Sequence, residues 1–140
     1  MASKAYRIFG TTADVGVVSR GTGLIPAFEG QAAGMIAVMT DMRRVRATEG
    51  FTVEAEGPDL PGLLVSWLEE LHFLFDTKGV LLKEFRITRL TGLRLKATVR
   101  GEAIDPNRHV MKTPIKAVTY HMLEVKETGE GVTTRVVYDI

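Results

Sequence analysis

Apolar residues between positions 59 and 76 recur every three or four residues, which is the spacing of one face of an α-helix. Asp59 precedes this stripe as a predicted N-cap, Pro61 falls in the first turn, and Gly79 is placed to end the helix. The pattern therefore predicts a helix over residues 59–76. Its apolar stripe consists of Leu60, Leu63, Leu64, Trp67, Leu68, Leu71 and Phe75.

A stripe of the same period predicts a second helix over residues 22–41, with Thr22 as its N-cap. Gly30 and Gly34 fall inside it, and each glycine destabilises a helix interior by about 1 kcal/mol relative to alanine. We interpret both glycines as points where the helix packs closely against a sheet. The stripe consists of Leu24, Phe28, Ala32, Met35 and Met39.

Most other segments alternate between apolar and polar residues, which is the period of a half-buried strand. Thr91-Gly92 and residues 128–131 carry turn signals, and each joins two such segments into a predicted hairpin. This pattern predicts the α+β class, with one mostly antiparallel or mixed sheet of hairpin-linked strands covered by the two helices. The predicted strands are residues 6–9, 15–19, 52–56, 85–88, 93–100, 117–126 and 132–139.

The composition agrees with a single domain over residues 1–140, since 45% of the residues are hydrophobic and 25% are charged. The absence of cysteine excludes disulfides, thiolate chemistry and cysteine-bound metals. A net charge of +1 gives no general attraction to nucleic acids or acidic membranes. No apolar run approaches the roughly 20 residues of a membrane span. Residues 1–6 also lack the apolar core of a signal peptide, so we expect a cytoplasmic protein.

The first candidate site is acidic. A strand that runs to Ile140 fixes the terminal α-carboxylate in space, and Asp139 adds a second carboxylate beside it. With Asp14 close in space, three carboxylates converge, and such a cluster requires protons or a cation for neutralisation. Oxygen ligands suit the hard cations Ca²⁺, Mg²⁺ and Mn²⁺. From spacing alone, the alternative is that Asp14 is a turn residue and Asp139 a solvated strand end.

The second candidate is a proline-braced loop between two predicted strands. Its candidate residues are Asp105, Arg108, His109, Lys112 and, just beyond the loop, Lys116. Arginine presents a planar fork that matches phosphate or carboxylate oxygens, and lysine presents a point charge. This composition predicts a contact loop for an anion or an acidic partner surface, and a solvated polar loop is the alternative.

Three weaker signals point to structure rather than chemistry. Arg94, Lys96 and Arg100 alternate on one strand without exposed aromatic residues between them, which favours a solvated sheet face over a nucleic-acid platform. We expect His72 to face solvent and His121 to form a hydrogen bond on a strand. No Ser–His–Asp order and no phosphate-binding lysine motif is present, so the residues favour a binding protein over an enzyme.

Several short stretches, taken together, resemble the archease family over nearly the whole chain. Thr12-Ala13-Asp14-Val15-Gly16 is similar to the family's N-terminal Thr-Ala-Asp motif, and Tyr138-Asp139-Ile140 is similar to its C-terminal end. Residues 63–71, followed by Phe75-Asp76, are similar to its second helix. The remaining similar stretches are Gly101-Glu102, Asp105-Pro106, Arg108-His109, Lys112-Thr113 and residues 116–121.

This resemblance implies a small cytoplasmic protein that assists the RtcB-type RNA ligase of tRNA splicing, which uses GTP to join a 2′,3′-cyclic phosphate end to a 5′-hydroxyl end. It implies that the protein promotes guanylylation and multiple turnover of the ligase, is not itself an enzyme, and contacts nucleic acid only through the ligase. It also implies a divalent-cation site, usually assigned to calcium, with Asp14, Asp139 and Ile140 as ligands.

The sequence departs from the family pattern at Gly10-Thr11, where the family usually has an acidic residue followed by histidine. One carboxylate and one imidazole are therefore absent beside the predicted site, and water is expected to complete the ligand shell. Two other functions stay open. A general protein-modulating chaperone for RNA-modifying enzymes predicts an exposed apolar patch and activity indifferent to loss of Asp139. A metal-dependent phosphohydrolase predicts turnover of phosphoesters by the protein alone.

Overall fold

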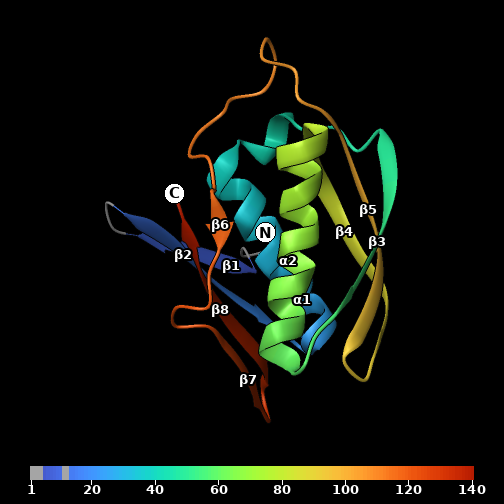
Figure 1. Cartoon of the computed structure of the whole chain (residues 1–140), viewed down its shortest axis with the longest axis vertical. Helices are drawn as coiled ribbons and strands as arrows, with labels where there is room; N and C mark the ends of the chain where they lie inside the picture. The colour runs from blue at the N-terminus through green and yellow to red at the C-terminus, as the bar shows by residue number, and fades with distance from the viewer. Residues whose placement is uncertain (1–4, 11–12) are drawn as a thin grey trace.

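Helices α1 (Leu24–Met39) and α2 (Leu60–Lys78) lie between two antiparallel β-sheets, as Figure 1 shows. The computed structural model describes residues 5–10 and 13–140. Helix α1 is buried on nearly every side, because it packs against strands of both sheets. This arrangement confirms the predicted single α+β domain with two main helices and antiparallel strands.

The strands form two sheets, so the expectation of one sheet is wrong. The larger sheet has the order β1-β2-β8-β6, with β7 also paired to β8, and the smaller has the order β3-β5-β4. Alternation identifies the buried face of a strand but not the element that covers it, so it cannot assign strands to sheets. The larger sheet comprises β1 (Tyr6–Gly10), β2 (Asp14–Gly21), β6 (Ala117–Val118), β7 (Glu124–Thr128) and β8 (Gly131–Asp139). The smaller comprises β3 (Glu49–Glu56), β4 (Val80–Thr91) and β5 (Arg94–Ala103), and a 3₁₀ helix, η1 (Met42–Arg44), precedes it.

The predicted helix ends are confirmed for α2 and only partly for α1. An Asp59 carboxylate oxygen accepts a hydrogen bond from the Gly62 amide at 2.7 Å, and Gly79 ends α2 in the left-handed conformation with φ 64°. Helix α1 instead has Gly23 as its N-cap, with no side-chain hydrogen bond, so the prediction of Thr22 as the cap is wrong.

Close packing at Gly30 and Gly34 is confirmed. A Cβ atom at Gly30 would overlap with Ser19 Oγ, and one at Gly34 would overlap with Val17 Cγ1. Both contacted residues belong to β2, so the two glycines let α1 approach this strand more closely than a side chain would permit.

Both hairpins form, but the segment predicted as one strand over residues 117–126 is interrupted. It divides into β6 and β7, which pair with different parts of β8 and are joined by a turn at residues 119–123. Met122 lies in this turn with φ 55°. Tyr120, His121 and Met122 carry no Gly, Pro, Asn or Asp turn signal, which is why alternation extended the strand through them. His121 is therefore an exposed turn residue, and its predicted place on a strand is wrong.

A buried polar network connects α1 to the larger sheet. Gln31 Nε2 donates hydrogen bonds to the Val17 carbonyl at 3.0 Å and to Thr134 Oγ1 at 2.8 Å, and Tyr138 Oη donates to Gln31 Oε1 at 2.8 Å. Gln31, Thr134 and Tyr138 have no solvent-accessible surface. Burial raises the pKa of the Tyr138 hydroxyl well above its usual value. The network therefore holds α1, β2 and β8 in one arrangement.

Neither helix resembles a membrane span. Over the described ranges, residues 5–10 and 13–140, no helix has the length and apolar character needed to cross a bilayer.

Candidate functional site

The two aspartates of the acidic candidate lie opposite each other on neighbouring strands. Asp14 begins β2, Asp139 ends β8, and the antiparallel register pairs the two residues directly. Cβ atoms of such a pair are about 4.5–5.5 Å apart, which lets both carboxylates reach one small cation. Asp139 is exposed and Asp14 is half-buried. The pairing brings together residues from opposite ends of the sequence, as the acidic-cluster prediction requires.

Both carboxylates lie on the face of the larger sheet that points away from α1, here called the outer face. Thr134, Val136 and Tyr138 of β8 are buried against the helices, and side chains alternate along a strand, so Asp139 points the other way. Direct cross-strand partners share a face, and Asp14 therefore accompanies Asp139.

The chain beyond Asp139 is held in place by its neighbours. The Lys116 amide donates to the Asp139 carbonyl at 2.8 Å, and Ala117 of β6 pairs with Asp139 from the side opposite to β2. The Ile140 side chain packs against the hydrophobic core. These contacts fix the main chain next to the acidic pair.

The donor set fits a hydrated hard cation rather than a closed metal cage. Within residues 5–10 and 13–140, no group of three His, Cys, Asp or Glu side chains is placed to hold a metal ion. The carboxylates of Asp14 and Asp139 supply only oxygen atoms, which Ca²⁺ and Mg²⁺ prefer, with water filling other positions. The sequence departs from the family pattern at Gly10-Thr11, and of these two residues Gly10 ends β1. Thr11, and Thr12 of the Thr-Ala-Asp motif, lie outside the described residues.

The structure turns Arg108 and His109 of the basic loop inward toward Glu102. Arg108 donates from Nη1 and Nη2 to the two Glu102 carboxylate oxygens at 2.7 and 2.6 Å. Nδ1 of His109 accepts from the Asp105 amide at 2.8 Å, so Nε2 carries a proton and donates to Glu102 at 2.9 Å. The Arg46 amide also donates to Glu102, at 2.6 Å. Asp105 itself accepts from the Asn107 amide, as in an Asx turn.

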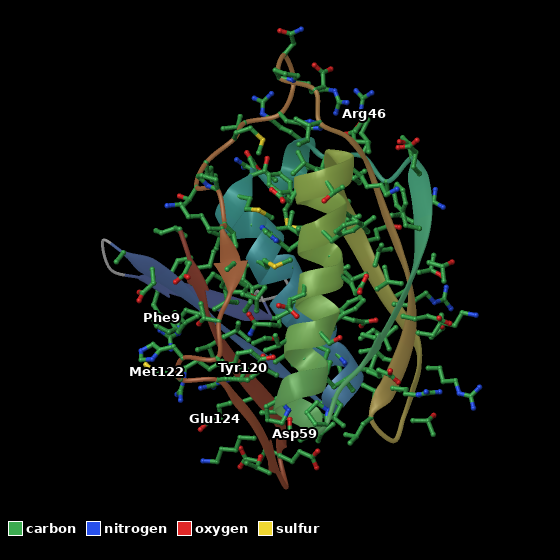
Figure 2. All side chains as sticks on the ribbon, viewed as in Figure 1. Phe9, Arg46, Asp59, Tyr120, Met122 and Glu124 are labelled. Atoms are coloured by element: carbon green, nitrogen blue, oxygen red, sulfur yellow. The ribbon has the colours of Figure 1, made fainter. Side chains whose placement is uncertain are left out.

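The Arg108 guanidinium, with smaller contributions from His109 and the Arg46 amide, holds the pKa of Glu102 well below its usual range. Arg46, labelled in Figure 2, lies near the end of the molecule where the β5–β6 connection makes its bend. Glu102 is therefore the centre of this network. Its role was not predicted from the sequence, because one glutamate at a strand end carries no distinctive signal.

The remaining loop residues, Lys112 and Lys116, are exposed and lie at different places. The Lys112 amide bonds to the Met39 carbonyl at the end of α1, and its charge contributes to lowering the pKa of Asp41, an effect due mainly to Arg43. Lys116 is instead adjacent in the structure to Asp139. The structure thus brings Asp105, Arg108 and His109 together, and it joins the backbone of Lys116 to that of Asp139.

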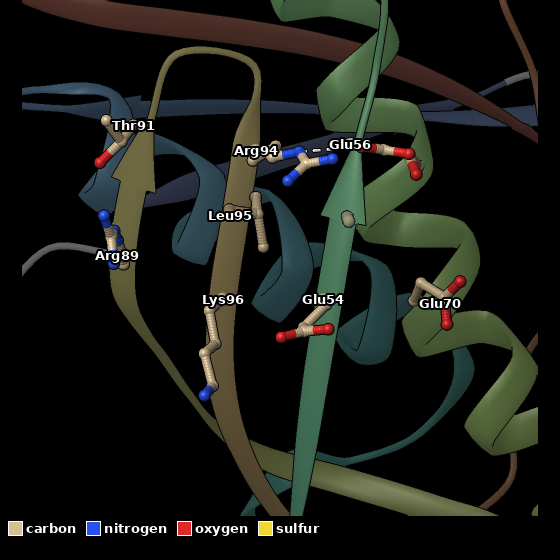
Figure 3. A pocket seen from close by; sticks show the side chains of 10 residues that line it. Glu54, Glu56, Glu70, Arg89, Thr91, Arg94, Leu95 and Lys96 are labelled. Atoms are coloured by element: carbon tan, nitrogen blue, oxygen red, sulfur yellow. Dashed lines mark hydrogen bonds and ion pairs between the residues drawn. The ribbon is translucent and has the colours of Figure 1, made fainter.

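Two other sequence signals have structural explanations. His72 is half-buried and lies 2.7 Å from the Ile115 carbonyl through Nε2, so the prediction that it faces solvent is wrong. An open hollow of about 860 Å³ beside the smaller sheet (Figure 3) includes Arg94 and Lys96. Arg94 pairs with Glu56 there at 3.0 Å. The hollow has as many acidic as basic side chains, which agrees with a solvated sheet face. The charged residues of the hollow are Glu54, Glu56, Glu70, Arg89, Arg94 and Lys96.

Comparisons with a family model and with known proteins point to the same family. The Archease protein family matches residues 6–140 of the chain. An archease from Thermococcus gammatolerans is 41% identical over 123 residues, covering 86% of this chain and 87% of that protein. The chain belongs to the archease family. Asp14 and Asp139, the two residues of the acidic pair, both lie within the matched range.

Further relatives agree with this placement. An archease from Methanothermobacter thermautotrophicus is 36% identical over 140 residues, covering 98% of this chain and 99% of that protein. The solution structure of Methanobacterium thermoautotrophicum protein 1598 superposes with a TM-score of 0.84 at 35% identity, covering 99% of this chain and 100% of that one. A Thermotoga maritima archease, described as a possible chaperone, has a TM-score of 0.57 at 21% identity and 94% coverage of each chain, a likeness of fold alone.

Proposed function

We propose that this archease-family chain assists an RtcB-type RNA ligase of tRNA splicing in the cytoplasm by promoting guanylylation and multiple turnover of the ligase. It acts as a non-catalytic partner and contacts RNA only through the ligase. Family membership supports this proposal. The observation that carries it is the direct pairing of Asp14 with Asp139, in which Asp139 is exposed and Asp14 is half-buried.

The proposal includes a divalent cation at the acidic pair, with Ca²⁺ as the first choice and Mg²⁺ or Mn²⁺ as alternatives. Asp14, Asp139 and the main-chain carboxylate at Ile140 would hold it. A bound cation would supply positive charge for negatively charged phosphate oxygens. The chain's own contribution is to hold two carboxylates opposite each other and to keep that of Asp139 exposed to the partner.

The basic loop divides between two proposed roles. Lys112 and Lys116 are exposed and would contact the partner or nucleotide phosphates, and Lys116 is the one next to Asp139. Arg108, His109 and Asp105 would support that contact by setting the shape of the loop, since their polar atoms bond to Glu102 and to the loop backbone.

A guanylylation assay with the cognate ligase tests the proposal. Asp14→Asn and Asp139→Asn remove charge while keeping the size of each side chain. Each variant should lower the maximal stimulation of guanylylation, and calcium affinity measured by titration calorimetry should fall roughly tenfold or more. Glu127→Gln, an exposed carboxylate near the other end of β8, is the matched control and should leave both unchanged. Full stimulation by both aspartate variants would contradict the mechanism.

A second test addresses Ile140. Residues added after Ile140 convert its carboxylate to an amide without touching either aspartate. Calcium affinity should then fall while the thermal unfolding of the protein stays within about 2 °C of the wild type. Unchanged affinity would remove this group from the proposed ligands.

A chaperone for RNA-modifying enzymes is the second candidate, because Tyr120 is 67% exposed and Met122 52% exposed, which is the kind of surface that function predicts. The Thermotoga maritima relative is described as a possible chaperone. The Asp139→Asn variant distinguishes the chaperone function from the ligase-activator function. A chaperone would protect client enzymes from aggregation equally well with this substitution, whereas a ligase activator would lose stimulation.

A further inference from the structure

The turn at residues 119–123 displays two large apolar side chains to solvent. Tyr120 is 67% exposed and Met122 is 52% exposed, more than any other large hydrophobic residue in the described ranges. Figure 2 shows Phe9 and Met122 on the side of the larger sheet that faces away from the helices, and Tyr120 belongs to the same turn as Met122. We call Phe9, Tyr120 and Met122 the apolar patch.

The backbone that carries this patch is held by many hydrogen bonds. The Thr119 hydroxyl donates to the Val137 carbonyl at 2.7 Å and accepts from the His121 amide at 3.2 Å. Arg135 Nε donates to the Met122 carbonyl at 2.8 Å, and Leu123 packs against the core. The turn is therefore anchored to β8 on both sides of its exposed residues, which holds the backbone that carries them.

Met122 adopts a conformation that does not favour its side chain. Among the described residues it is the single non-glycine with positive φ, at 55°, where glycine is the residue without steric cost. Local strain of this kind is maintained where the surrounding structure enforces it, and such residues cluster at functional sites. The left-handed methionine therefore marks this turn as a place to look for function.

The apolar patch lies next to the acidic pair on the outer face. Phe9, Gly16 and Val137 form one cross-strand row, and a Cβ atom at Gly16 would overlap with the Phe9 ring, which therefore covers that glycine. The neighbouring row is Asp14 and Asp139, two residues further along each strand, or about 7 Å away. Thr119, at the start of the turn, bonds to Val137 within the apolar row.

We infer that the apolar patch is the docking anchor for the partner protein to which Asp14 and Asp139 are presented. This inference rests on the proposed function and adds the surface used. Its occupant is a protein face with an apolar recess beside a positively charged site, made of bound metal ions or basic side chains, because the acidic pair requires a charge complement one row away. Aromatic and methionine side chains are typical anchors of such interfaces.

Charge disfavours a second copy of the chain as the occupant. Two copies of the chain that met symmetrically through this face would bring two acidic pairs together. Arg7, Arg20 and Arg135 also lie on this face, with Arg7 6.0 Å from the centre of the Phe9 ring and Arg135 bonded to the Met122 carbonyl.

The test uses Tyr120→Ser and Met122→Gly, together and separately, in the full chain. Glycine tolerates positive φ, so Met122→Gly removes the side chain without unfolding the turn. Phe73→Ser on α2 is the matched control, since Phe73 is 50% exposed and lies outside the patch. The readouts are the Kd for the cognate ligase by biolayer interferometry and the dependence of guanylylation on chain concentration.

The double variant should raise Kd roughly tenfold or more, while the maximal stimulation at saturating concentration stays at the wild-type level. Phe73→Ser should change neither quantity. A wild-type Kd in the double variant would overturn the docking inference and leave the proposed function intact. Self-association of the wild-type chain that the double variant abolishes would assign the patch to a second copy and overturn the inference. Absence of any binding or stimulation by the wild-type chain would overturn the proposed function and the docking inference with it.

Discussion

Replacing Tyr138 with phenylalanine removes one hydroxyl from a network with no access to solvent. In the wild type this hydroxyl donates to Gln31 Oε1 at 2.8 Å, while Gln31 Nε2 is occupied by the Val17 carbonyl and Thr134 Oγ1. The phenyl ring still fills its place in the core, so the substitution leaves a buried amide oxygen without its donor. An orphaned acceptor of this kind destabilises a protein by about 1–3 kcal/mol.

The expected loss can be converted into a melting temperature. For 140 residues, an unfolding entropy of about 2.1 cal/mol/K per residue sums to about 0.3 kcal/mol/K, so Tm should fall by about 3–10 °C. Urea unfolding at pH 7, followed by circular dichroism, measures the free energy of unfolding directly. In a Gln31→Met background the amide oxygen is absent, so Tyr138→Phe should be less costly there. An equal cost in both backgrounds, or a loss below about 0.5 kcal/mol, would refute the reasoning.

The same substitution has a pH signature. Burial raises the pKa of Tyr138 in the folded state above its value of about 10 in the unfolded chain. The unfolded state therefore releases a proton above pH 10 that the folded state retains, and the stabilisation present below pH 10 is lost as the pH rises, by up to about 1.4 kcal/mol per pH unit. Phenylalanine does not ionise, so the difference in stability between wild type and variant should shrink above pH 10.

Two further substitutions test other parts of the structure. Glu102→Gln leaves the Arg108 guanidinium without its counter-charge and should lower the free energy of urea unfolding at pH 7 by about 1–3 kcal/mol, a moderate value because the Arg108 side chain is 28% exposed. Since the pKa of Glu102 is lowered in the folded state, its stabilisation is present above about pH 4.3 and is lost as the pH falls below it, and the variant should lack this component of acid unfolding. Gly34→Ala places a Cβ atom against Val17 and should lower the free energy of unfolding by about 1–3 kcal/mol, whereas Gly129→Ala, which meets no atom within 4 Å, should change it far less; equal effects would contradict close packing as the reason for Gly34.

Local signals predicted the parts of the fold that are determined locally. The Asp59 cap and the Gly79 terminator act on hydrogen bonds within a few residues, and both are found as the sequence indicates. Gly30 and Gly34 are unfavourable in a helix unless tertiary packing requires them, so their presence predicted a close helix–strand contact. From spacing alone the closeness of Asp14 to Asp139 was only a condition, and it was the resemblance to the archease family that favoured the pairing now seen between β2 and β8.

The parts that sequence reasoning missed depend on long-range partners. Arg108 and His109 have the composition of a ligand-binding loop, but both donate hydrogen bonds to Glu102, which also accepts one from the Arg46 amide. A buried carboxylate needs such donors, and no local pattern shows which residues will supply them. The turn that contains Met122 was missed for a similar reason, since hydrogen bonds from β8 impose its left-handed conformation on a residue that does not favour it.

The geometry of the acidic pair depends on the register between β2 and β8. A shift of one residue would move one carboxylate to the helix-facing side of the sheet, because side chains alternate along a strand. The buried pairs Val15–Tyr138 and Ser19–Thr134 fix this register, and Gln31 bridges the two strands from α1. Tyr138→Phe removes one of the bonds made by Gln31 but leaves the ladder and both buried pairs in place. We therefore expect this variant to lose stability while retaining the calcium affinity of the wild type within about twofold, measured by titration calorimetry well below its Tm. A parallel loss of affinity would show that the buried network, and not the backbone ladder, positions the carboxylates.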